Sequence, residues 1–327
     1  MTGCGTKAAE PAVEKGGASG TETKPAEQPE KVRIGADSAA FSLQFRVAKA
    51  KGFFEKNGID AEVQTFSFGI DTLNAAVLGQ VDTAEGMDYA VASRLAKGSL
   101  KVVGLINTPK EKNGELFVKG DIIKPGDLKG KKLGVAKGTV NEYIWARLLE
   151  KYKIDEKDVT LQYLQSAPEI LAAIERGDVD AAFFDGANKA KAAKVEGVKS
   201  IGDYSLIGFR QRGYFVLQEG LVKDKPEVVT RLFNALEEAT QYIKENPEDT
   251  ADIAFKELKL PREAILSEIK DNWDYDIRFT QEDYDHLKGV YEWSNENGLI
   301  KEKFDLKDKV VIEPLKKAFP DKVTYQP

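Results

Sequence analysis

Cysteine and histidine are almost absent from this chain, since its 327 residues contain one of each, Cys4 and His286. One cysteine cannot form an intramolecular disulfide, and without clustered Cys and His a zinc site is not expected. No Gly-x-x-x-x-Gly-Lys-[Ser/Thr] phosphate loop occurs either. Serine–histidine–aspartate catalysis would need His286, in a predicted helical segment, to reach a distant serine. We therefore expect no metal and no cofactor, while acid–base catalysis by carboxylates alone stays open.

Long apolar runs and a basic excess are absent as well. No stretch approaches the 18 or more apolar residues typical of a membrane-spanning helix. The net charge is −6, with 48 Lys and Arg against 54 Asp and Glu, so a nucleic acid is not an expected partner. An apolar fraction of 42% and a charged fraction of 31% are typical of a soluble protein. The length is sufficient for two lobes with cores of their own.

The N-terminal 30 residues have the composition of a tether. Residues 5–30 contain no aromatic side chain and are mostly Ala, Gly, Glu, Lys, Pro and Thr, so they cannot bury a core. Thr2-Gly3-Cys4 resembles the end of a bacterial lipobox, in which the signal peptide is removed before a cysteine that carries lipid. We expect residues 1–30 to be a lipid-attachment cysteine and a disordered tether. The alternative is a chance cysteine on an accidental tail.

An internal repeat indicates two like lobes. Residues 73–88 recur as residues 171–186, an offset of 171 − 73 = 98. Two more matches keep nearly the same spacing, residues 63–66 with 161–164 and residues 34–36 with 133–135. Gly-x-Val-Asp-x-Ala alone is a common helix-to-strand turn, but three matches in order favour a duplicated unit with a cleft between its copies.

Strands alternate with helices of about ten residues in both halves, which predicts an α/β fold with a parallel-type sheet flanked by helices in each lobe. Residues 31–115 and 214–327 are expected to form lobe I, and residues 116–213 to form lobe II. The expected strands are 32–36, 61–66, 81–84, 100–106 and 214–218 in lobe I, and 133–136, 159–164 and 179–184 in lobe II. The clearest expected helices are 41–51, 140–151, 168–176 and 228–246, and the chain after Pro226 is expected to be mainly helical.

Ligands of such sheets bind beyond the carboxyl ends of the strands, where loops lead into helices. Each of these loops meets a helix N-terminus, whose free N–H groups can hold an anionic group. The same small polar residues are also common N-caps. The candidate ligand-binding residues in and beside these loops are Asp37, Ser38, Phe41, Ser67, Phe68, Gly69, Met87, Asp88, Tyr89, Thr139, Glu142 and Asp185. Tyr143, Tyr214 and Trp273 are further aromatic candidates, of which Trp273 interrupts the C-terminal helices and is placed to overhang the cleft.

The motifs together resemble a known family. They are Val32-Arg33-Ile34-Gly35, Ala48-Lys49-Ala50-Lys51-Gly52-Phe53-Phe54-Glu55-Lys56-Asn57-Gly58-Ile59-Asp60, Gly79-Gln80-Val81-Asp82, Asp127-Leu128-Lys129-Gly130-Lys131-Lys132-Leu133, Lys137-Gly138-Thr139, Gly177-Asp178-Val179-Asp180-Ala181, Phe279-Thr280-Gln281-Glu282-Asp283 and Asn297-Gly298-Leu299-Ile300. In this order, over residues 31–305, the chain resembles the type II periplasmic binding proteins of ABC importers, in the nitrate/sulfonate/taurine-like group. The resemblance implies two lobes that close over a small solute and deliver it to a permease.

The resemblance also implies a cellular place and a set of partners. Gram-positive members are commonly lipid-anchored, so we expect an extracytoplasmic protein held through Cys4 on the outer face of the bacterial cell membrane. The expected partners are a small-molecule solute and an ABC transporter permease, and the protein itself is expected to be a monomer. A sensor that signals with the same two lobes is an alternative. An enzyme like the pyrimidine synthase of thiamine biosynthesis shares the fold, but its histidine and cysteine chemistry has no counterpart among these residues.

The expected ligand differs from that of the sulfonate binders. Those relatives usually carry an aromatic residue, a polar residue and Pro after the second Val-Asp-Ala strand, where this chain has Asp185-Gly186-Ala187, and Glu142 stands where some of them have His. Asp37 and Asp88 add acids on the facing lobe. A closed cleft desolvates these carboxylates, which then require a partner or a proton. We expect a cationic or zwitterionic solute that contains nitrogen, with an aliphatic sulfonate, taurine or nitrate as the alternative.

Overall fold

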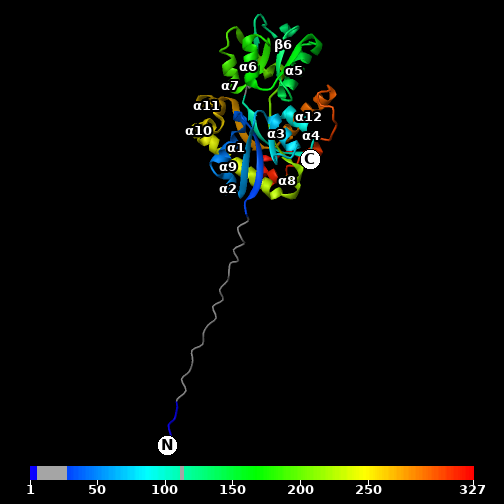
Figure 1. Ribbon diagram of the computed structural model, residues 1–327. Coiled ribbons are helices and arrows are strands. Elements are labelled where there is room, and N and C mark those ends of the chain that lie inside the picture. Colours follow the sequence, from blue (N-terminus) through cyan, green and yellow to red (C-terminus); the bar gives the residue numbers. More distant parts are fainter. Residues whose placement is uncertain (6–27, 111–113) are drawn as a thin grey trace.

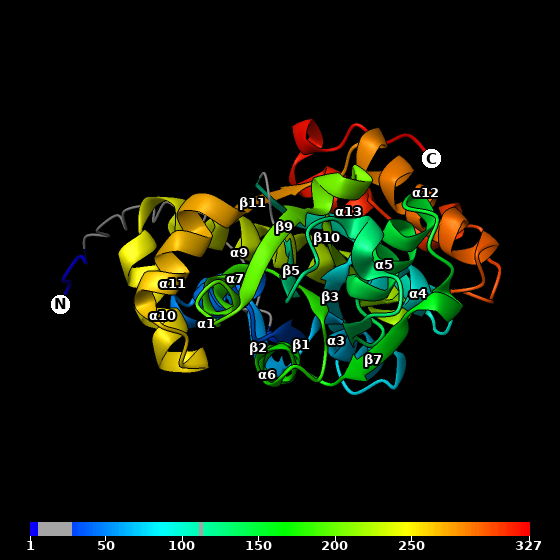
Figure 2. The same cartoon turned by 90° about the horizontal axis from the view of Figure 1, so that it is seen from above.

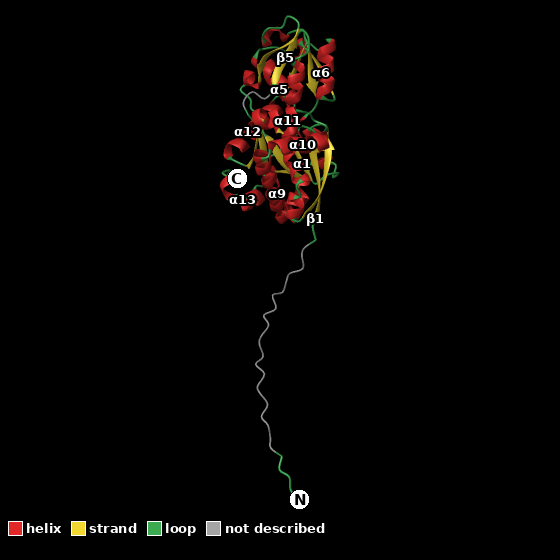
Figure 3. Ribbon diagram, turned by 90° about the vertical axis from the view of Figure 1, so that its left-hand side faces the viewer, coloured by secondary structure: helices red, strands yellow, loops and turns green. Residues whose placement is uncertain are grey.

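The computed structural model describes residues 1–5, 28–110 and 114–327, so most of the expected tether lies outside the described residues. Two α/β lobes stack on one another, lobe II above lobe I in the view of Figure 1. Each lobe is built on its own sheet, and helices cover both sheets (Figure 3). Among the described residues, no helix is both long and apolar enough to cross a membrane.

Lobe I contains a six-stranded sheet in the order β11-β4-β10-β3-β1-β2. Its strands are β1 (Glu30–Asp37), β2 (Ile59–Phe66), β3 (Thr83–Met87), β4 (Leu100–Pro109), β10 (Gly213–Gln218) and β11 (Trp273–Arg278). Its helices are α1 (Leu43–Ala50), α2 (Phe53–Lys56), α3 (Gly69–Val77), α4 (Asp88–Leu95), α8 (Glu219–Asp224), α9 (Pro226–Glu245), α10 (Pro247–Leu258), α11 (Arg262–Ser267), α12 (Gln281–Glu296) and α13 (Glu313–Ala318). Short helical turns add η1 (Ala40–Ser42), the π-helix η5 (Glu268–Asn272), η6 (Lys307–Lys309) and η7 (Pro320–Lys322).

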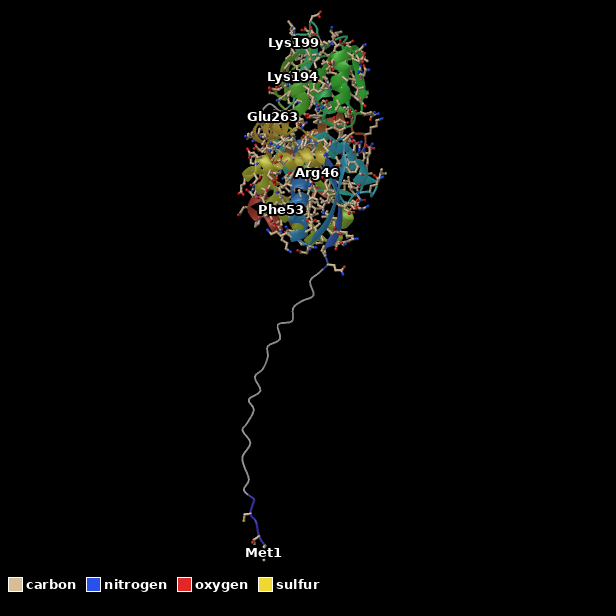
Figure 4. All side chains as sticks on the ribbon, turned by 60° about the vertical axis from the view of Figure 1, so that its left-hand side comes forward. Met1, Arg46, Phe53, Lys194, Lys199 and Glu263 are labelled. Atoms are coloured by element: carbon tan, nitrogen blue, oxygen red, sulfur yellow. The ribbon has the colours of Figure 1, made fainter. Side chains whose placement is uncertain are left out.

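Lobe II contains a five-stranded sheet in the order β7-β6-β8-β5-β9. Its strands are β5 (Glu115–Lys119), β6 (Lys132–Ala136), β7 (Thr160–Leu164), β8 (Ala181–Phe184) and β9 (Val198–Asp203). Its helices are α5 (Val140–Lys151), α6 (Ala167–Arg176) and α7 (Gly186–Ala192), with the short turns η2 (Pro125–Leu128), η3 (Glu156–Asp158) and η4 (Tyr204–Ile207). Lys194 and Lys199 lie at the end of this lobe that is remote from lobe I, whereas Glu263 of α11 lies where the lobes meet (Figure 4).

The repeat in the sequence corresponds to equivalent strand pairings in the two lobes. Ile34 pairs with Val63 on one side and with Thr83 on the other. In lobe II, Leu133 pairs with Leu161 and with Ala181. The offsets are 133 − 34 = 99, 161 − 63 = 98 and 181 − 83 = 98, as in the sequence matches. The two lobes therefore share the strand order β2-β1-β3 and β7-β6-β8.

Both sheets are mixed, which corrects the expectation of parallel-type sheets. β10 runs antiparallel to β3 in lobe I, and β5 runs antiparallel to β8 in lobe II. The reason is the path of the chain, because each of these strands follows a crossing from the other lobe and enters its sheet from the opposite end. Three strands, β5, β9 and β11, were also not expected, and β11 begins at Trp273, where the sequence predicted only an interruption of the C-terminal helices.

Glycines allow α3 and α6, which are equivalent helices of the two repeats, to pack close to their sheets. A Cβ on Gly35 would lie 3.1 Å from Cβ of Thr72, and one on Gly134 would lie 2.9 Å from Cγ2 of Ile170. Both distances are too short for unstrained contact, so any larger residue would separate helix from sheet. This close packing fixes where α3 and α6 begin, and both helices begin at the cleft.

Local signals define the helices that border the cleft. Ser166 precedes α6 and its Oγ accepts the Glu169 N–H at 3.3 Å, while Pro168 occupies the first turn. Gly177 ends the helix in a left-handed conformation, with φ of 82°. The apolar face of α6, which includes Ile170 and Ile174, is buried against the sheet. The sequence prediction of a helix over 168–176 is therefore confirmed to within one residue.

Candidate ligand-binding cleft

A cavity of about 420 Å³ lies between the two lobes. It is lined by the loops that follow β1, β2 and β3 in lobe I and those that follow β6, β7 and β8 in lobe II. The segment from α11 to β11 forms a further wall, and Figure 2 shows α11 beside α7 on one side of the cleft. The volume falls in the range of pockets for small molecules.

Most of the residues predicted to contact ligand line this cavity. The ten that do so are Asp37, Ser38, Phe41, Ser67, Phe68, Gly69, Met87, Thr139, Asp185 and Trp273. Trp273 packs on Phe41 with ring centroids 5.6 Å apart, so β11 and the η1 turn make one aromatic wall. Trp273 thus reaches the cleft as expected, although it does so from a strand. The structure holds no ligand, and their contact with a solute stays a prediction.

Five of the predicted residues do not line the cavity, and one of them, Tyr143, packs against Trp293 of lobe I with ring centroids 5.3 Å apart. Asp88 is fully buried beneath it, where Oδ2 accepts the Arg212 backbone N–H at 3.0 Å. Tyr89 and Glu142 meet each other across the cleft, with 3.1 Å between the Tyr89 hydroxyl and Glu142 Oε2. Tyr214 is buried in the core of lobe I and its hydroxyl donates to the Asp283 carbonyl oxygen at 2.9 Å. Strand ends place these residues near the cleft, but their partners turn them away from the cavity.

Asp37 is the most deeply buried acid of the cavity wall, with 2% of its surface exposed. Burial raises its pKa to about 8, partly opposed by N–H donors of Ala39 and Gly69. The carboxylate of Asp185, from the other lobe, raises this pKa further. Glu85 lies below Asp37, and its Oε1 accepts the Asp37 backbone N–H at 2.9 Å. Burial also raises the pKa of Glu85. The N–H groups at the start of α3 thus already have a carboxylate partner in Asp37.

Asp185 and Glu268 bring two more carboxyl groups to the cavity. Burial raises the pKa of Asp185 although part of its surface is exposed, and its carboxylate has no hydrogen bond or ion pair with any described side chain. Burial raises the pKa of Glu268 to about 7, and the nearby Asp185 raises it as well. Glu268 Oε2 accepts the Trp273 indole N–H at 3.0 Å, which orients the carboxyl group. The positive charge of Lys189 lowers the pKa values of both Asp185 and Glu268 and so partly offsets the effect of burial. Its Nζ lies 3.6 Å from Glu115 Oε1.

Sequence reasoning missed Glu268 and Gln211, both of which line the cavity. Glu268 begins a π-helix, a feature that often marks functional positions but has no reliable sequence pattern. Gln211 lies in the segment that crosses from lobe II back to lobe I. The positions of Glu268 and Gln211 depend on how distant segments pack against one another. In the sequence, their polar side chains were the only sign of a place in the cavity wall. Lys191 is the one basic side chain among the residues that line the cavity.

Beside the cavity, side chains of both lobes form a contact that we call the aromatic rim, made of Tyr89, Tyr143, Arg147, Phe209 and Trp293. Tyr143 of α5 packs edge-on against Trp293 of α12, with centroids 5.3 Å apart. The Arg147 guanidinium lies 5.1 Å from the Trp293 ring, and the Trp293 indole N–H donates to Glu150 Oε2 at 3.2 Å. Figure 1 shows α12 and α4 of lobe I together below α5 of lobe II.

The chemistry available in the cavity is binding through charge and apolar contact. Three carboxyl groups face apolar and aromatic walls, and among the described residues no group of His, Cys, Asp and Glu is arranged to hold a metal ion. The single histidine, His286, lies outside the cavity, with Nε2 2.7 Å from Asp88 Oδ1. It is therefore tied to Asp88 rather than placed beside a cavity serine. Cys4 is exposed and is not among the residues that line the cavity.

Comparison with known proteins finds a matching family model and a relative of a similar kind. The family model described as NMT1/THI5 like matches residues 42–250. The taurine-binding periplasmic protein of Escherichia coli is 29% identical over 212 residues, which cover 62% of this chain and 64% of that protein. This relative is named as a binding protein, which is in line with the expectation of a protein that is not an enzyme.

Solved structures share the fold. The periplasmic aliphatic sulphonate binding protein from Escherichia coli superposes with a TM-score of 0.74 at 21% identity, covering 87% of this chain and 92% of that chain. The periplasmic nitrate-binding protein from Synechocystis superposes with a TM-score of 0.70 at 15% identity, covering 89% of this chain and 88% of that chain. The two-lobed periplasmic binding protein fold predicted from the sequence is thereby confirmed.

Proposed function

The chain belongs to the NMT1/THI5-like family, and from that membership we propose that it is the solute-binding component of an ABC importer, with a small cationic or zwitterionic, nitrogen-containing solute held between its lobes. The observation that carries the proposed charge of the solute is the convergence of Asp37, Asp185 and Glu268 on one cavity. They come from lobe I, lobe II and the C-terminal segment, so a solute would contact all three only when the lobes lie together.

The energetic reason is the cost of burying carboxylates. An ionised carboxylate removed from water requires a counter-charge or a proton. Asp185 raises the pKa of both Asp37 and Glu268, so the three acids share one charged environment. An ammonium, amidinium or guanidinium group between them would relieve this repulsion. The apolar walls from Phe41, Phe68 and Trp273 suit a hydrocarbon or aromatic body attached to that group.

A sulfonate, taurine or nitrate is the second candidate, because relatives with these ligands in their names match the chain or its fold. Such an anion would need donors. Lys191 lines the cavity, but N–H donors of Ala39 and Gly69 are directed at Asp37. Taurine is itself a zwitterion, and its ammonium group would suit the carboxylates. A simple anion is therefore less favoured than a solute that carries a positive charge.

The proposal includes no chemical step in the solute. Closing of two lobes over a ligand is sufficient for capture, and the cavity lacks a histidine or cysteine among its lining residues. Import rather than sensing is proposed because the relatives named above are binding proteins of the periplasmic type. We also propose that Cys4 carries lipid and holds a monomer on the outer face of the cell membrane, where a permease receives the solute.

The test is a thermal-shift screen followed by isothermal titration. Benzylamine, benzamidine, guanidine and taurine form the cationic and zwitterionic arm, and ethanesulfonate and nitrate form the anionic arm. A ligand that binds only the folded state raises the melting temperature. Stabilisation by cationic compounds is expected, and stabilisation by the simple anions alone would overturn the proposed charge of the solute.

Variants then assign the binding to the cavity. Asp185→Asn and Glu268→Gln should each weaken binding of the stabilising cation by about tenfold, equivalent to about 1.4 kcal/mol. Asp155→Asn is a matched control, because it removes the same charge from lobe II at an exposed site whose partner is Lys157. Equal affinities in all three variants would show that the cation binds elsewhere.

A further inference from the structure

The buried side chain of Gln211 indicates a further contact with a ligand. It lines the cavity, and only 2% of its surface is exposed. No hydrogen bond joins its amide to another of the described residues, and neither amide atom is among the fully buried polar atoms that lack a partner, so the amide is open to the cavity. A glutamine amide offers two N–H donors and a carbonyl acceptor, and here they are available to a solute in the cavity.

Gln44 is a buried glutamine with which Gln211 can be compared. Its side chain is fully buried in lobe I, where its Nε2 donates to Thr240 Oγ1 at 2.7 Å and its Oε1 has no partner among the described residues. That bond joins α1 to α9, so the Gln44 amide has a structural role. Gln211 has the same chemistry and nearly the same burial, but it borders the space between the lobes instead of another element.

The backbone on both sides of Gln211 is held in place. The Arg210 Nε–H donates to the Pro109 carbonyl oxygen at 2.8 Å, and the Arg212 backbone N–H donates to Asp88 Oδ2 at 3.0 Å. Asp88 is in turn fixed on its other oxygen, which lies 2.7 Å from His286 Nε2. These contacts join the two segments that pass between the lobes, one after β4 and one before β10, to α4 and α12. Gln211 is thus presented from a fixed position at the junction of the lobes, as a group that recognises a ligand must be.

We propose that the Gln211 amide binds a neutral carbonyl oxygen of the solute by donating a hydrogen bond from Nε2. This inference rests on the proposed function, in which the carboxyl groups of Asp37, Asp185 and Glu268 hold the cationic nitrogen. Because those acids line the same cavity, they would repel an anionic group elsewhere on the solute, whereas they would not repel a neutral carbonyl. The solute class is then an amine or amidine that also carries an amide-type carbonyl.

The first measurement compares the melting temperatures of Gln211→Met and Gln44→Met without ligand. Methionine has a similar length and no strong hydrogen-bonding group, so each change removes one amide. Gln44→Met should lower the melting temperature by about 2 to 4 °C, because it removes a bond that the fold uses. Gln211→Met should stay within about 1 °C of the unaltered protein. A decrease as large as that of Gln44→Met would overturn the inference by showing a structural role.

The second measurement uses three probes with the same benzylammonium group. Benzylamine has no acceptor, 4-(aminomethyl)benzamide has a neutral carbonyl, and 4-(aminomethyl)benzenesulfonate has an anionic acceptor. By isothermal titration, the unaltered protein should bind the benzamide about tenfold more tightly than benzylamine. In Gln211→Met the two affinities should become equal, with benzylamine binding unchanged, and Gln44→Met should keep the tenfold preference.

The outcomes separate the two proposals. If the unaltered protein binds benzylamine and the benzamide equally, or if Gln211→Met keeps the preference, the role of Gln211 is overturned and the cationic solute stands. If the sulfonate probe binds more tightly than the benzamide and loses affinity in Gln211→Met, the neutral carbonyl is wrong. If neither amine binds the unaltered protein, the cationic solute fails, and the carbonyl assignment fails with it.

Discussion

The cavity wall and the aromatic rim both join the two lobes, but they do so through opposite kinds of contact. The rim is satisfied within the protein, since Tyr143, Arg147 and Trp293 contact one another and the Tyr89 hydroxyl contacts Glu142. The cavity wall is not satisfied, since burial and like charge raise the pKa values of Asp37, Asp185 and Glu268. The rim joins the lobes through contacts within the protein, whereas the wall is where we propose that a solute supplies the missing charge.

This difference separates two properties that a binding protein must balance. Contacts in the rim form only while the lobes lie together, so they set the population of the closed arrangement and thereby scale the apparent affinity for every ligand. Contacts in the wall decide which ligand is bound. Changes in the rim should therefore alter all affinities by one factor, and changes in the wall should alter the preference among ligands.

The largest expected effect is a dependence of cation binding on pH, because the wall contains acids whose pKa values lie near neutrality. The pKa of Asp37 is about 8 and that of Glu268 about 7. A cation binds the ionised forms, so the affinity for benzylamine should rise about tenfold or more between pH 6 and pH 8, measured by isothermal titration. An affinity that does not change over this range would contradict the assignment of these acids to the cation site.

The ligand-free protein should show the opposite trend in stability. The Asp37 pKa is raised from 3.8 to about 8 on folding, so the folded state binds this proton more tightly than the unfolded state. Its contribution to stability is complete below about pH 4 and is lost as the pH rises to about 8. Asp37→Asn does not titrate, so its melting temperature should decrease less between pH 5 and pH 8 than that of the unaltered protein. An identical decrease in both would place the titrating group elsewhere.

The next effect in size is that of Trp293→Ala, which removes the centre of the rim. The lost contacts are the edge-on packing with Tyr143, the stacking with Arg147 and the bond to Glu150, together worth about 1 to 3 kcal/mol. We expect affinities for all probes to decrease about tenfold by one common factor. Small-angle X-ray scattering should show a larger radius of gyration without ligand.

Tyr242→Ala is the matched control for that change. Tyr242 packs edge-on against Phe53 at 6.0 Å and lies under Lys51 at 4.8 Å, all within lobe I. Its loss should lower the melting temperature and leave both the affinities and the radius of gyration unchanged. If the two variants had the same effect on affinity, the rim would have no special part in closing the lobes.

Much of the fold was predictable because the duplicated unit leaves a regular pattern. The alignment of residues 34–36 with 133–135 predicted which strands pair, and the pairings of Ile34 and Leu133 agree with it. The antiparallel direction of β5 and β10 could not be predicted, because it depends on which lobe the chain has just left. Trp273–Arg278 alternates apolar and charged residues, a pattern typical of a strand, but the sequence prediction went no further than an interruption of the C-terminal helices at Trp273.

The site was predictable where a strand end alone decides position, as at Asp37, Ser67 and Asp185, which line the cavity. It was not predictable where a partner decides orientation. Asp88 occupies a strand end too, but β10 brings the Arg212 N–H beside it and α12 brings His286, so its carboxylate faces these groups. Glu268 and Gln211 lie in segments without a repeat, so no pattern related them to the cleft.

The smallest expected effect is that of Tyr89→Phe, which removes one hydroxyl from the rim. The ring would still stack with Tyr143 at 6.4 Å, and only the bond to Glu142 Oε2 would be lost. Such a bond is worth about 1 kcal/mol, so affinities for all probes should decrease about fivefold. Tyr291→Phe is the matched control, since its hydroxyl accepts the Phe304 N–H at 2.8 Å on lobe I alone, and it should change stability but not affinity. A change in the preference among probes in Tyr89→Phe would contradict the separation of rim and wall, because it would mean that Tyr89 contacts the solute.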